Sequence, residues 1–309
     1  MSAAVDAAAH AAESAAVMTR GLGRRFGSKW AVQDCTLSIP EGRVCGLVGA
    51  NGAGKTTLLR MLAGLSTPTA GELAVCGRRP SDDVAFLSDV GFLAQEIPLH
   101  GRWNAEDHLR LGAAMNPRWD DAIARERLHA LQIPLEQPIR TLSGGQRAQV
   151  ALALCLGKRP RVLLLDEPVA ALDPLARREF LSTLAAAVAD GDLTVVLSSH
   201  LVTDLERICD YLVVLAAAQT MLAADIEDVL ATHRVLTSAR RDTSAIERDH
   251  VVLQRETTQR QTSLWVRLNG PLHEPGWQAD ELGLEDIVLA YLGSQHPPEP
   301  SPPMRTVAS

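Results

Sequence analysis

The chain has 309 residues, 46% of them hydrophobic, so it can bury a full core as one large domain with an appendage or as two domains. Its formal net charge is -7 at pH 7. This acidic balance supplies no excess of Lys and Arg for a nucleic-acid backbone or an anionic membrane surface, and we therefore expect no nucleic-acid partner.

Neither a secretory signal nor a membrane span is evident. Residues 1–17 are Ala-rich and lack a positively charged region ahead of an apolar block, which favours a flexible tail. The apolar run nearest to a span, Tyr211–Ala224, falls short of the roughly 18 to 20 residues required and is interrupted by Gln219. Five cysteines without a C-x-x-C spacing favour reduced thiols. We expect a cytoplasmic chain, and any membrane role would have to go through partners.

Short apolar runs predict a sheet. A strand-like pattern starts near Met18, and Val44–Val48 is an apolar run that leads into a glycine-rich loop and a helix over Lys55–Leu65. The runs Val162–Leu165 and Leu193–Leu197 are too short for helices and are typical of strands buried on both faces of a parallel sheet. The pattern therefore predicts an α/β core with a mostly parallel sheet.

Helical periodicity dominates residues 100–157, which predicts an α-helical subdomain inserted between strands of that sheet. A different piece begins near Ile226, with expected helices and strands at Ile226–His233, Val251–Gln254, Leu264–Leu268 and Leu284–Leu292. We expect residues 18–225 to form the main domain and residues 226–296 a small α+β accessory domain. Residues 297–309 are Pro-rich and predict a disordered tail.

The run from Gly49 to Thr56 fits G-x-x-x-x-G-K-[ST] and lies between a predicted strand and a predicted helix, as a P-loop requires. Its backbone N–H groups and the helix N-terminus would hold phosphates, Lys55 would reach the β- and γ-phosphates, and Thr56 would bind Mg²⁺. The alternative is a glycine-rich turn without a ligand. The expected nucleotide-binding residues here are Gly49, Asn51, Gly52, Gly54, Lys55, Thr56 and Thr57.

A second motif is the apolar strand that ends in Asp166 and Glu167. In a parallel sheet the ligand crevice lies beyond the carboxyl ends of the strands, where the glycine-rich loop is also expected. Asp166 would then bind magnesium, and Glu167 would polarise an attacking water as general base. Taken alone, such a strand end is often only a solvated turn.

The third motif, Leu142-Ser143-Gly144-Gly145-Gln146, precedes Asp166 and opens an apolar helix over Ala148–Leu156. Ser143 is the expected N-cap, and the two glycines leave the helix N-terminus open to a second anion, or simply bare. With this motif the chain resembles the ABC ATPase family, because Leu-Ser-Gly-Gly-Gln is the signature of that family and stands at its usual place ahead of the Asp-Glu strand.

The resemblance covers about Met18 to Ala224 and implies further roles. It implies that Gln95 contacts Mg²⁺ and the attacking water, that His200 contacts the γ-phosphate, and that Phe26 stacks on adenine. The alternatives are a polar turn residue, a structural hydrogen-bonding histidine and a buried phenylalanine. It also implies that Ser143, Gly144, Gly145 and Gln146 bind the nucleotide held by a second subunit, and that the segment around Asp173 crosses the dimer interface.

The same resemblance implies a P-loop NTPase fold and a Mg-dependent ATPase that works as a homodimer, although a heterodimer is also open. Its partners would be membrane-spanning permease subunits, which would hold it peripherally on the cytoplasmic face and dock near Ile97–Trp103. The closing helix resembles the accessory segment of exporter-type ATPases, which favours export. The alternatives are a soluble ABC ATPase without a membrane partner and a regulatory module that binds nucleotide without turnover, against which Glu167 argues.

Overall fold

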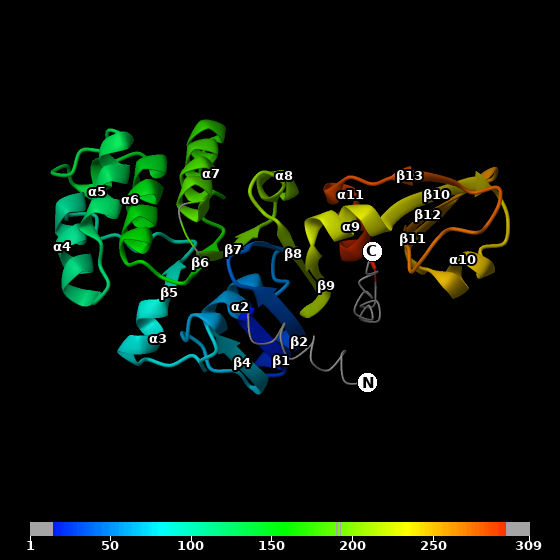
Figure 1. Cartoon of the computed structure of the whole chain (residues 1–309), viewed down its shortest axis with the longest axis horizontal. Helices are drawn as coiled ribbons and strands as arrows, with labels where there is room; N and C mark the ends of the chain where they lie inside the picture. Colours follow the sequence, from blue (N-terminus) through cyan, green and yellow to red (C-terminus); the bar gives the residue numbers. More distant parts are fainter. Residues whose placement is uncertain (1–14, 190, 192, 295–309) are drawn as a thin grey trace, which may run out of the picture. The chain divides into compact units, whose positions relative to one another are not determined.

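The computed structural model describes residues 15–294 apart from residues 190 and 192. The chain divides into two compact units, Met1–Asp225 and Ile226–Ser309, and each is described here by itself (Figure 1). The Pro-rich tail and residues 1–14 lie outside the described part. Strand β1, Ala15–Phe26, starts within the stretch expected to be a flexible tail. This expectation fails for the last residues of that stretch because Val17 is buried in the core and pairs with Ile39.

The first unit is built on a six-stranded sheet with the order β5-β6-β7-β3-β8-β9. The first five strands in this order are parallel, and β9 is antiparallel to β8. Every residue of β3, β6, β7 and β8 is buried, as expected for parallel strands covered on both faces. The bounds are β3 Val44–Val48, β5 Val90–Leu93, β6 Val162–Asp166, β7 Thr194–Ser199, β8 Tyr211–Ala216 and β9 Gln219–Asp225. The predicted α/β fold class with a mostly parallel sheet is thus confirmed.

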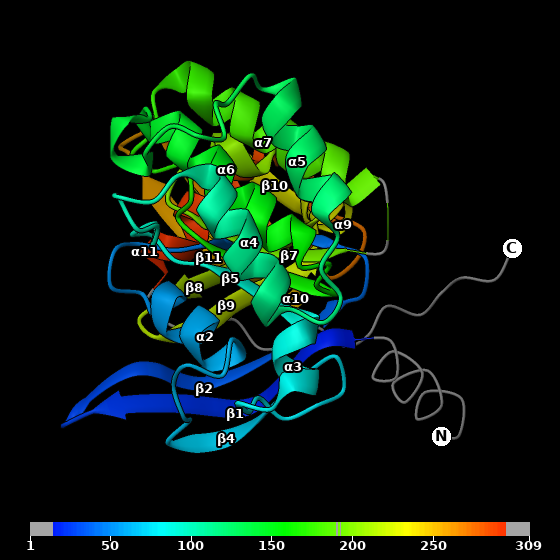
Figure 2. The ribbon, with the colours of Figure 1, turned by 90° about the vertical axis from the view of Figure 1, so that its left-hand side faces the viewer.

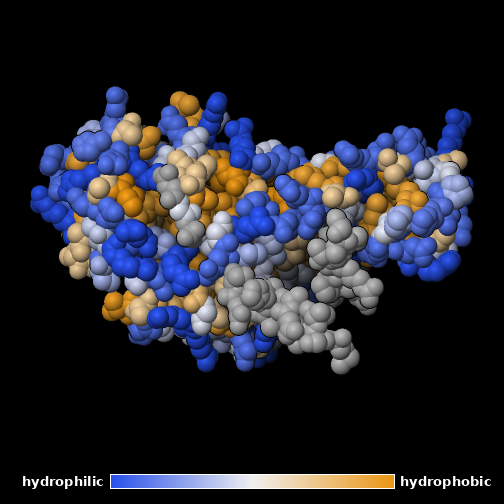
Figure 3. Space-filling model, viewed as in Figure 1, coloured by the Kyte–Doolittle hydropathy of each residue, from blue (hydrophilic) through white to orange (hydrophobic). Residues whose placement is uncertain are grey.

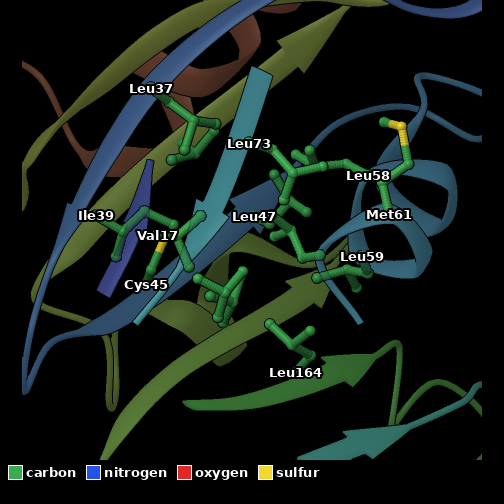
Figure 4. Close-up of a cluster of buried hydrophobic side chains, with 14 of the residues drawn as sticks. Val17, Leu37, Ile39, Cys45, Leu47, Leu58, Leu59, Met61, Leu73 and Leu164 are labelled. Carbon is green, nitrogen blue, oxygen red and sulfur yellow. The ribbon is translucent and has the colours of Figure 1, made fainter. Parts of the chain in front are cut away.

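A second, smaller sheet is antiparallel and has the order β2-β1-β4. Helix α2 packs between this sheet and the central sheet (Figure 2). Its further strands are β2 Lys29–Pro40 and β4 Ala70–Val75, and α2 spans Lys55–Leu62. Figure 2 shows α2 between the layer of β1, β2 and β4 and the central sheet. Side chains from both sheets and from α2 meet in one apolar cluster, for example Val17, Leu47, Leu59 and Leu164 (Figure 4). The helix that follows the glycine-rich loop is therefore held by apolar packing on two sides.

Helix α2 ends earlier than the predicted Leu65, because Gly64 adopts a left-handed conformation with φ 76°. The Leu65 N–H donates to the Arg60 carbonyl at 2.8 Å, and the Gly64 N–H donates to the Met61 carbonyl at 3.1 Å. These two bonds close the helix with the geometry of a Schellman cap, which needs a residue that tolerates positive φ at this place. The helix therefore ends at Leu62, three residues before the predicted end at Leu65.

An all-helical part is inserted between β5 and β6. It contains α4 Ala105–Met115, α5 Asp121–Ala130 and α6 Gly144–Gly157, which share an apolar core that includes Leu109 and Leu128. Helix α7, Pro174–Ala189, follows β6, and the shorter α3 Val84–Asp89 and α8 Val202–Leu205 flank β5 and β7. On the face that Figure 3 shows, hydrophilic residues alternate with smaller apolar areas over this helical part. The apolar cluster of this part is made of its own residues, separate from the cluster around α2.

The apolar run Tyr211–Ala224 forms the hairpin of β8 and β9. The chain reverses at Ala217 and Ala218, which have φ of 48° and 67°. In the part of the chain that the structure describes, no helix combines the length and the apolar character that crossing a membrane requires.

The second unit is an α+β fold around an antiparallel sheet with the order β11-β12-β10-β13. Its small core includes Leu236, Leu264 and Val266. Helices α9 and α11 contribute the buried residues Val229 and Tyr291. The bounds are α9 Ile226–Thr232, β10 His233–Ala239, α10 Ser244–Asp249, β11 Val251–Thr257, β12 Gln261–Arg267, β13 Gln278–Glu281 and α11 Leu284–Gly293.

Candidate functional site: a cluster at the carboxyl ends of three parallel strands

Strands β6, β7 and β3 are neighbours in the central sheet and run parallel, so their carboxyl ends lie at one edge. The glycine-rich loop follows β3, Asp166 and Glu167 stand at the end of β6, and His200 follows β7. The three motifs are far apart in the sequence, yet the topology places them together.

Lys55 is the first residue of α2 and is almost fully buried, with an exposed fraction of 5%. Its Nζ donates to the Gly49 carbonyl at 2.8 Å and forms an ion pair with Glu167 Oε1 at 3.2 Å. A buried ammonium requires such partners, since an unpaired charge in the interior is costly. Lys55 therefore provides a fixed positive charge between the loop and the end of β6.

Thr56, Asp166 and Ser198 form a second set of contacts. Thr56 Oγ1 donates to Asp166 Oδ1 at 3.1 Å, and Ser198 Oγ donates to the same oxygen at 3.0 Å. Ser198 Oγ also accepts the Glu167 N–H at 2.8 Å. The hydroxyl of Ser198 thus connects the two carboxylate residues of β6 and holds them in a defined relative position.

Glu167 has a strained backbone. Its φ is 48°, a left-handed conformation that costs roughly 1–2 kcal/mol for a residue with a Cβ. His200 Nδ1 donates to Glu167 Oε2 at 2.8 Å, while Lys55 holds the other carboxylate oxygen. Burial raises the pKa of the Glu167 carboxyl, but its hydrogen bonds with His200 and Lys55 and their charges outweigh burial, so the pKa lies below its ordinary value. The side chain is therefore an ionised, oriented acceptor at neutral pH.

The glycine-rich loop is shaped by two glycines with positive φ. Gly54 has φ 110°, and a Cβ at this position would lie 2.3 Å from the Ala31 carbonyl oxygen of β2. Gly52 has φ 81°, and a Cβ there would meet open space. Gly54 thus allows close packing of the loop on β2, whereas Gly52 is needed only for its positive φ, since the space beside it is open.

The donors and acceptors of this cluster fit a magnesium-bound phosphate chain. A hydroxyl and a carboxylate, on Thr56 and Asp166, are hard oxygen ligands of the kind that Mg²⁺ takes together with substrate phosphates. Lys55 and the start of α2 offer positive charge to phosphate oxygens. The described residues contain no group of three or more His, Cys, Asp or Glu side chains suited to a metal. Oxygen ligands from the substrate would therefore have to complete the site.

Comparison with known proteins agrees with this geometry. Residues 32–170 match the protein family described as "ABC transporter". The chain is 38% identical to "Phosphonates import ATP-binding protein PhnC 1" of Natronomonas pharaonis, over 69% of this chain and 97% of that protein. The chain belongs to the ABC transporter ATP-binding family. As a member of the ABC ATPases it binds ATP and hydrolyses it in a reaction coupled to transport.

Two further ABC proteins show the breadth of the similarity. "Nod factor export ATP-binding protein I" of Ralstonia nicotianae is 34% identical, over 63% of this chain and 62% of that protein. A solved structure titled "Structure of ATP binding subunit of ABC transporter" is 25% identical and superimposes with a TM-score of 0.62, covering 70% of this chain and 92% of its own. The P-loop NTPase fold that the sequence predicts is therefore confirmed.

Three residues expected at the ABC ATPase site lie outside the hydrogen-bonded cluster. Gln95 is exposed just after β5, at the edge strand next to β6. Asn51 is exposed in the glycine-rich loop, and Thr57 is half-buried in the first turn of α2. Among the described residues no hydrogen bond joins their side chains to Lys55, Asp166 or Glu167, so their roles in nucleotide binding stay predictions. Gln95 follows β5, whose residues pair in parallel with β6.

Phe26 lies at the end of β1, next to the turn into β2, and 56% of its surface is exposed. The alternative that it is a buried core residue is therefore wrong. The ring faces the guanidinium group of Arg24, whose carbon lies 4.8 Å from the ring centroid. An exposed aromatic ring is available for stacking on a base.

The ABC signature forms the N-terminus of α6, as predicted from Ser143. Ser143 Oγ accepts the Gln146 N–H at 3.1 Å, and Gln146 Oε1 accepts the Ser143 N–H at 2.9 Å, so both side chains are used in a capping box. A Cβ at Gly145 would lie 2.7 Å from the Ala176 Cβ of α7, whereas a Cβ at Gly144 would meet nothing closer than 4.0 Å. Within the described residues no hydrogen bond joins this motif to the cluster of Lys55, Thr56, Asp166, Glu167, Ser198 and His200, which we call the Lys55 cluster.

Ser198 is the residue of the cluster that sequence reasoning did not assign. It is fully buried, and its backbone pairs with Asp166 across β6 and β7. The available signal was a hydroxyl in an otherwise apolar buried strand, because a buried polar group needs hydrogen-bond partners.

Proposed function

We propose that this ABC ATPase binds Mg-ATP at the Lys55 cluster and hydrolyses it with Glu167 as general base. The observation that carries the proposal is the convergence on Glu167 of Lys55 and His200, at 3.2 and 2.8 Å, from three separate segments. Phosphate oxygens would compete with Glu167 for the Lys55 ammonium. Glu167 would then be free to accept a proton from water while His200 keeps its carboxylate oriented.

Mg²⁺ bound by Thr56, Asp166 and the phosphates would neutralise the charge that develops on the transferred group. The Asp166 carboxylate of this proposed magnesium site is held by hydrogen bonds from the hydroxyl groups of Thr56 and Ser198. Gln95 is proposed to join the metal and the attacking water from the neighbouring strand end. The glycine-rich loop, with Gly49, Asn51, Gly52 and Gly54, and the adjacent Thr57 would cradle the phosphates.

We also propose that two copies form a head-to-tail dimer in which the signature of one subunit covers the nucleotide of the other. Ser143 is exposed, and the space around Gly144 is open, so a second anion can approach the N-terminus of α6. The cap of α7 by Asp173, which accepts the N–H groups of Leu175 and Ala176 at 3.0 Å each, fixes the segment proposed to cross the interface.

Separate membrane-spanning permease subunits are the proposed partners, because the related proteins are named as ATP-binding proteins of import or export. Trp103, 39% exposed and in ring contact with His100 and His108, offers an aromatic docking point in the expected permease groove. The chain would then lie peripherally on the cytoplasmic face. The relatives named for phosphonates, molybdenum, aliphatic sulfonates and sulfate/thiosulfate are import proteins, and one relative is named for export, so the related proteins favour import over the export that the closing helix indicated.

The replacement Glu167→Gln tests the general base and the dimer together. The amide keeps the shape of the side chain but loses its negative charge and basicity, so turnover should fall by a factor on the order of 100 or more while ATP still binds. Because the bound γ-phosphate would persist, this variant should elute from size-exclusion chromatography as a dimer with Mg-ATP and as a monomer with Mg-ADP.

The matched control is the same variant with Lys55→Ala added. Without the buried ammonium, the phosphates lose their main cation, and the double variant should stay monomeric in Mg-ATP. Wild-type turnover in Glu167→Gln would remove Glu167 as the base. A monomer at saturating ATP would contradict the proposed dimer.

A further inference from the structure

Arg24 and Phe26 stand two residues apart at the end of β1, and the guanidinium carbon of Arg24 lies 4.8 Å from the centre of the Phe26 ring. The same guanidinium donates through Nη1 to the Thr67 carbonyl oxygen at 2.6 Å. Thr67 belongs to the loop between α2 and β4, directly after the helix that the glycine-rich loop opens. Arg24 thus connects the Phe26 ring to a segment anchored by the phosphate-binding helix.

The surroundings make this connection rigid. The loop after α2 is bonded to the end of β1 twice more: the Thr69 N–H donates to the Gly23 carbonyl at 2.7 Å, and Thr69 Oγ1 accepts the Arg25 N–H at 3.1 Å. Arg24 pairs across the hairpin with Val32, whose Cγ2 would lie 3.1 Å from a Cβ added at Gly54. The strand pair that carries Arg24 and Phe26 is therefore packed directly against the phosphate-binding loop.

One face of the Phe26 ring is covered by the anchored guanidinium, yet 56% of the residue remains exposed. A planar base that approaches the ring meets its free face. An aromatic side chain that is already held in place loses less conformational freedom on stacking, so the fixed ring binds more tightly than a free one. A cation over the ring is itself favourable, which keeps the ring and guanidinium together before the base arrives.

We propose that Arg24 is a positioning residue for the nucleobase: it clamps one face of Phe26 to the loop after α2, so that the opposite face receives the adenine ring. The proposal rests on the proposed function, in which Phe26 stacks on the base of ATP. It adds a residue that touches neither the base nor the phosphates and acts through Phe26. Its effect is therefore confined to ligands that carry a base.

The test compares the affinities of the full chain for Mg-ATP and for Mg-tripolyphosphate, which has the phosphate chain but no base. Arg24→Ala should weaken ATP binding by about tenfold and leave tripolyphosphate binding unchanged. Arg24→Lys keeps the cation and should recover part of the loss. Arg25→Ala is the matched control, because Arg25 lies over Trp30, at 5.5 Å from its ring centre, and should leave both affinities unchanged.

A double-mutant cycle with Phe26→Leu identifies the path of the effect. If Arg24 acts through the ring, Arg24→Ala should cause no further loss of ATP affinity in the Phe26→Leu background. Three results would overturn the proposal: an equal loss of both ligands, tighter ATP binding because Arg24 occupies the face that the base needs, or no change. Failure of the wild-type chain to bind tripolyphosphate, or indifference of this binding to Lys55→Ala, would instead count against the proposed phosphate site.

Discussion

At the scale of single residues, the site depends on groups whose positions are fixed before any ligand arrives. Lys55 and Asp166 are buried and hydrogen-bonded, and Glu167, in a left-handed conformation, is held by bonds to its N–H and to both carboxylate oxygens. Such preorganisation lowers the cost of arranging charges during phosphoryl transfer. The hydroxyl of Ser198 accepts the N–H of Glu167 and so helps to hold this conformation.

Replacing Ser198 by Ala should therefore disturb the chemistry more than the binding of ATP. Loss of the hydroxyl leaves the Glu167 N–H and one Asp166 oxygen without that partner, which we expect to cost about 1–2 kcal/mol of the free energy of unfolding. Turnover should fall by roughly ten- to a hundredfold, because Glu167 is released from its fixed position. Steady-state kinetics and urea unfolding would measure the two effects.

The neighbouring Ser199→Ala variant is the control. Ser199 Oγ bonds only to the backbone of Leu201 among the described residues, so its removal should leave turnover close to wild type. Equal losses of turnover in both variants would show that the end of β7 acts merely as a structural support.

At the scale of helices and strands, the sequence predicted the parts of the chain in which one physical signal dominates. The sequence predicted β3, β6 and β7 from their apolar runs. It also predicted the start of α6 from its N-cap residue, Ser143. The sequence did not predict the hairpin of β8 and β9, because its turn residues Ala217 and Ala218 take positive φ although they are neither Gly nor Asn. Strand β13 was also missed, since all of its residues are exposed and polar or small.

The candidate site was predictable to the same degree. Lys55, Thr56, Asp166, Glu167 and His200 belong to motifs with fixed spacing, and the structure brings their side chains together. Arg24 and Ser198 belong to no such motif. Their contacts arise only when β1 meets the loop after α2 and when β7 pairs with β6, so tertiary contacts that leave no local pattern decide their positions.

One junction of elements in the second unit should make its stability depend on pH. His233 is buried where α9 meets β10; its Nδ1 lies 2.7 Å from the Val229 carbonyl, and its Nε2 lies 2.9 Å from the Tyr291 hydroxyl of α11. The pKa of His233 is lowered from 6.5 to about 4, mainly by burial. The hydrogen bond to Val229 raises this pKa, and the charges of Arg267 and Arg234 lower it further.

Below pH 6.5 the unfolded chain binds a proton that the folded unit does not, so the free energy of unfolding should decrease as the pH falls from 6.5 to 4. The loss should reach about 3 kcal/mol at the acidic end. Amide hydrogen exchange in β10 and β12, corrected for the pH dependence of the intrinsic rate, would measure this loss of the free energy of unfolding. His233→Gln should flatten the profile, whereas replacing the exposed His273 should not. A profile that is unchanged in His233→Gln would assign the pH dependence to other groups.

At the scale of the whole molecule, all residues of the proposed ATP site belong to the first unit, Met1–Asp225. The second unit has its own sheet and its own core around Leu236 and Leu264. The proposed catalytic residues therefore require only the first unit, and the second unit has a core of its own.

A chain that ends at Asp225 should consequently fold and bind Mg-ATP within about twofold of the full-length affinity, because a domain with its own core can fold alone. Binding should remain sensitive to Lys55→Ala. Circular dichroism and nucleotide titration would measure both properties. A folded truncated chain with much weaker ATP binding would show that the second unit supports the site.

The order of strands in the central sheet also determines when the first unit can fold during synthesis on the ribosome. Strand β3, which leads into the glycine-rich loop, lies between β7 and β8 in the sheet. During synthesis β3 must wait, without its partners, until Thr194–Ser199 and Tyr211–Ala216 have emerged, which takes on the order of ten seconds at usual rates of translation. For that interval its apolar residues are open to chaperones and to aggregation. The nascent chain can hold no nucleotide through the complete cluster until nearly the whole first unit has been made.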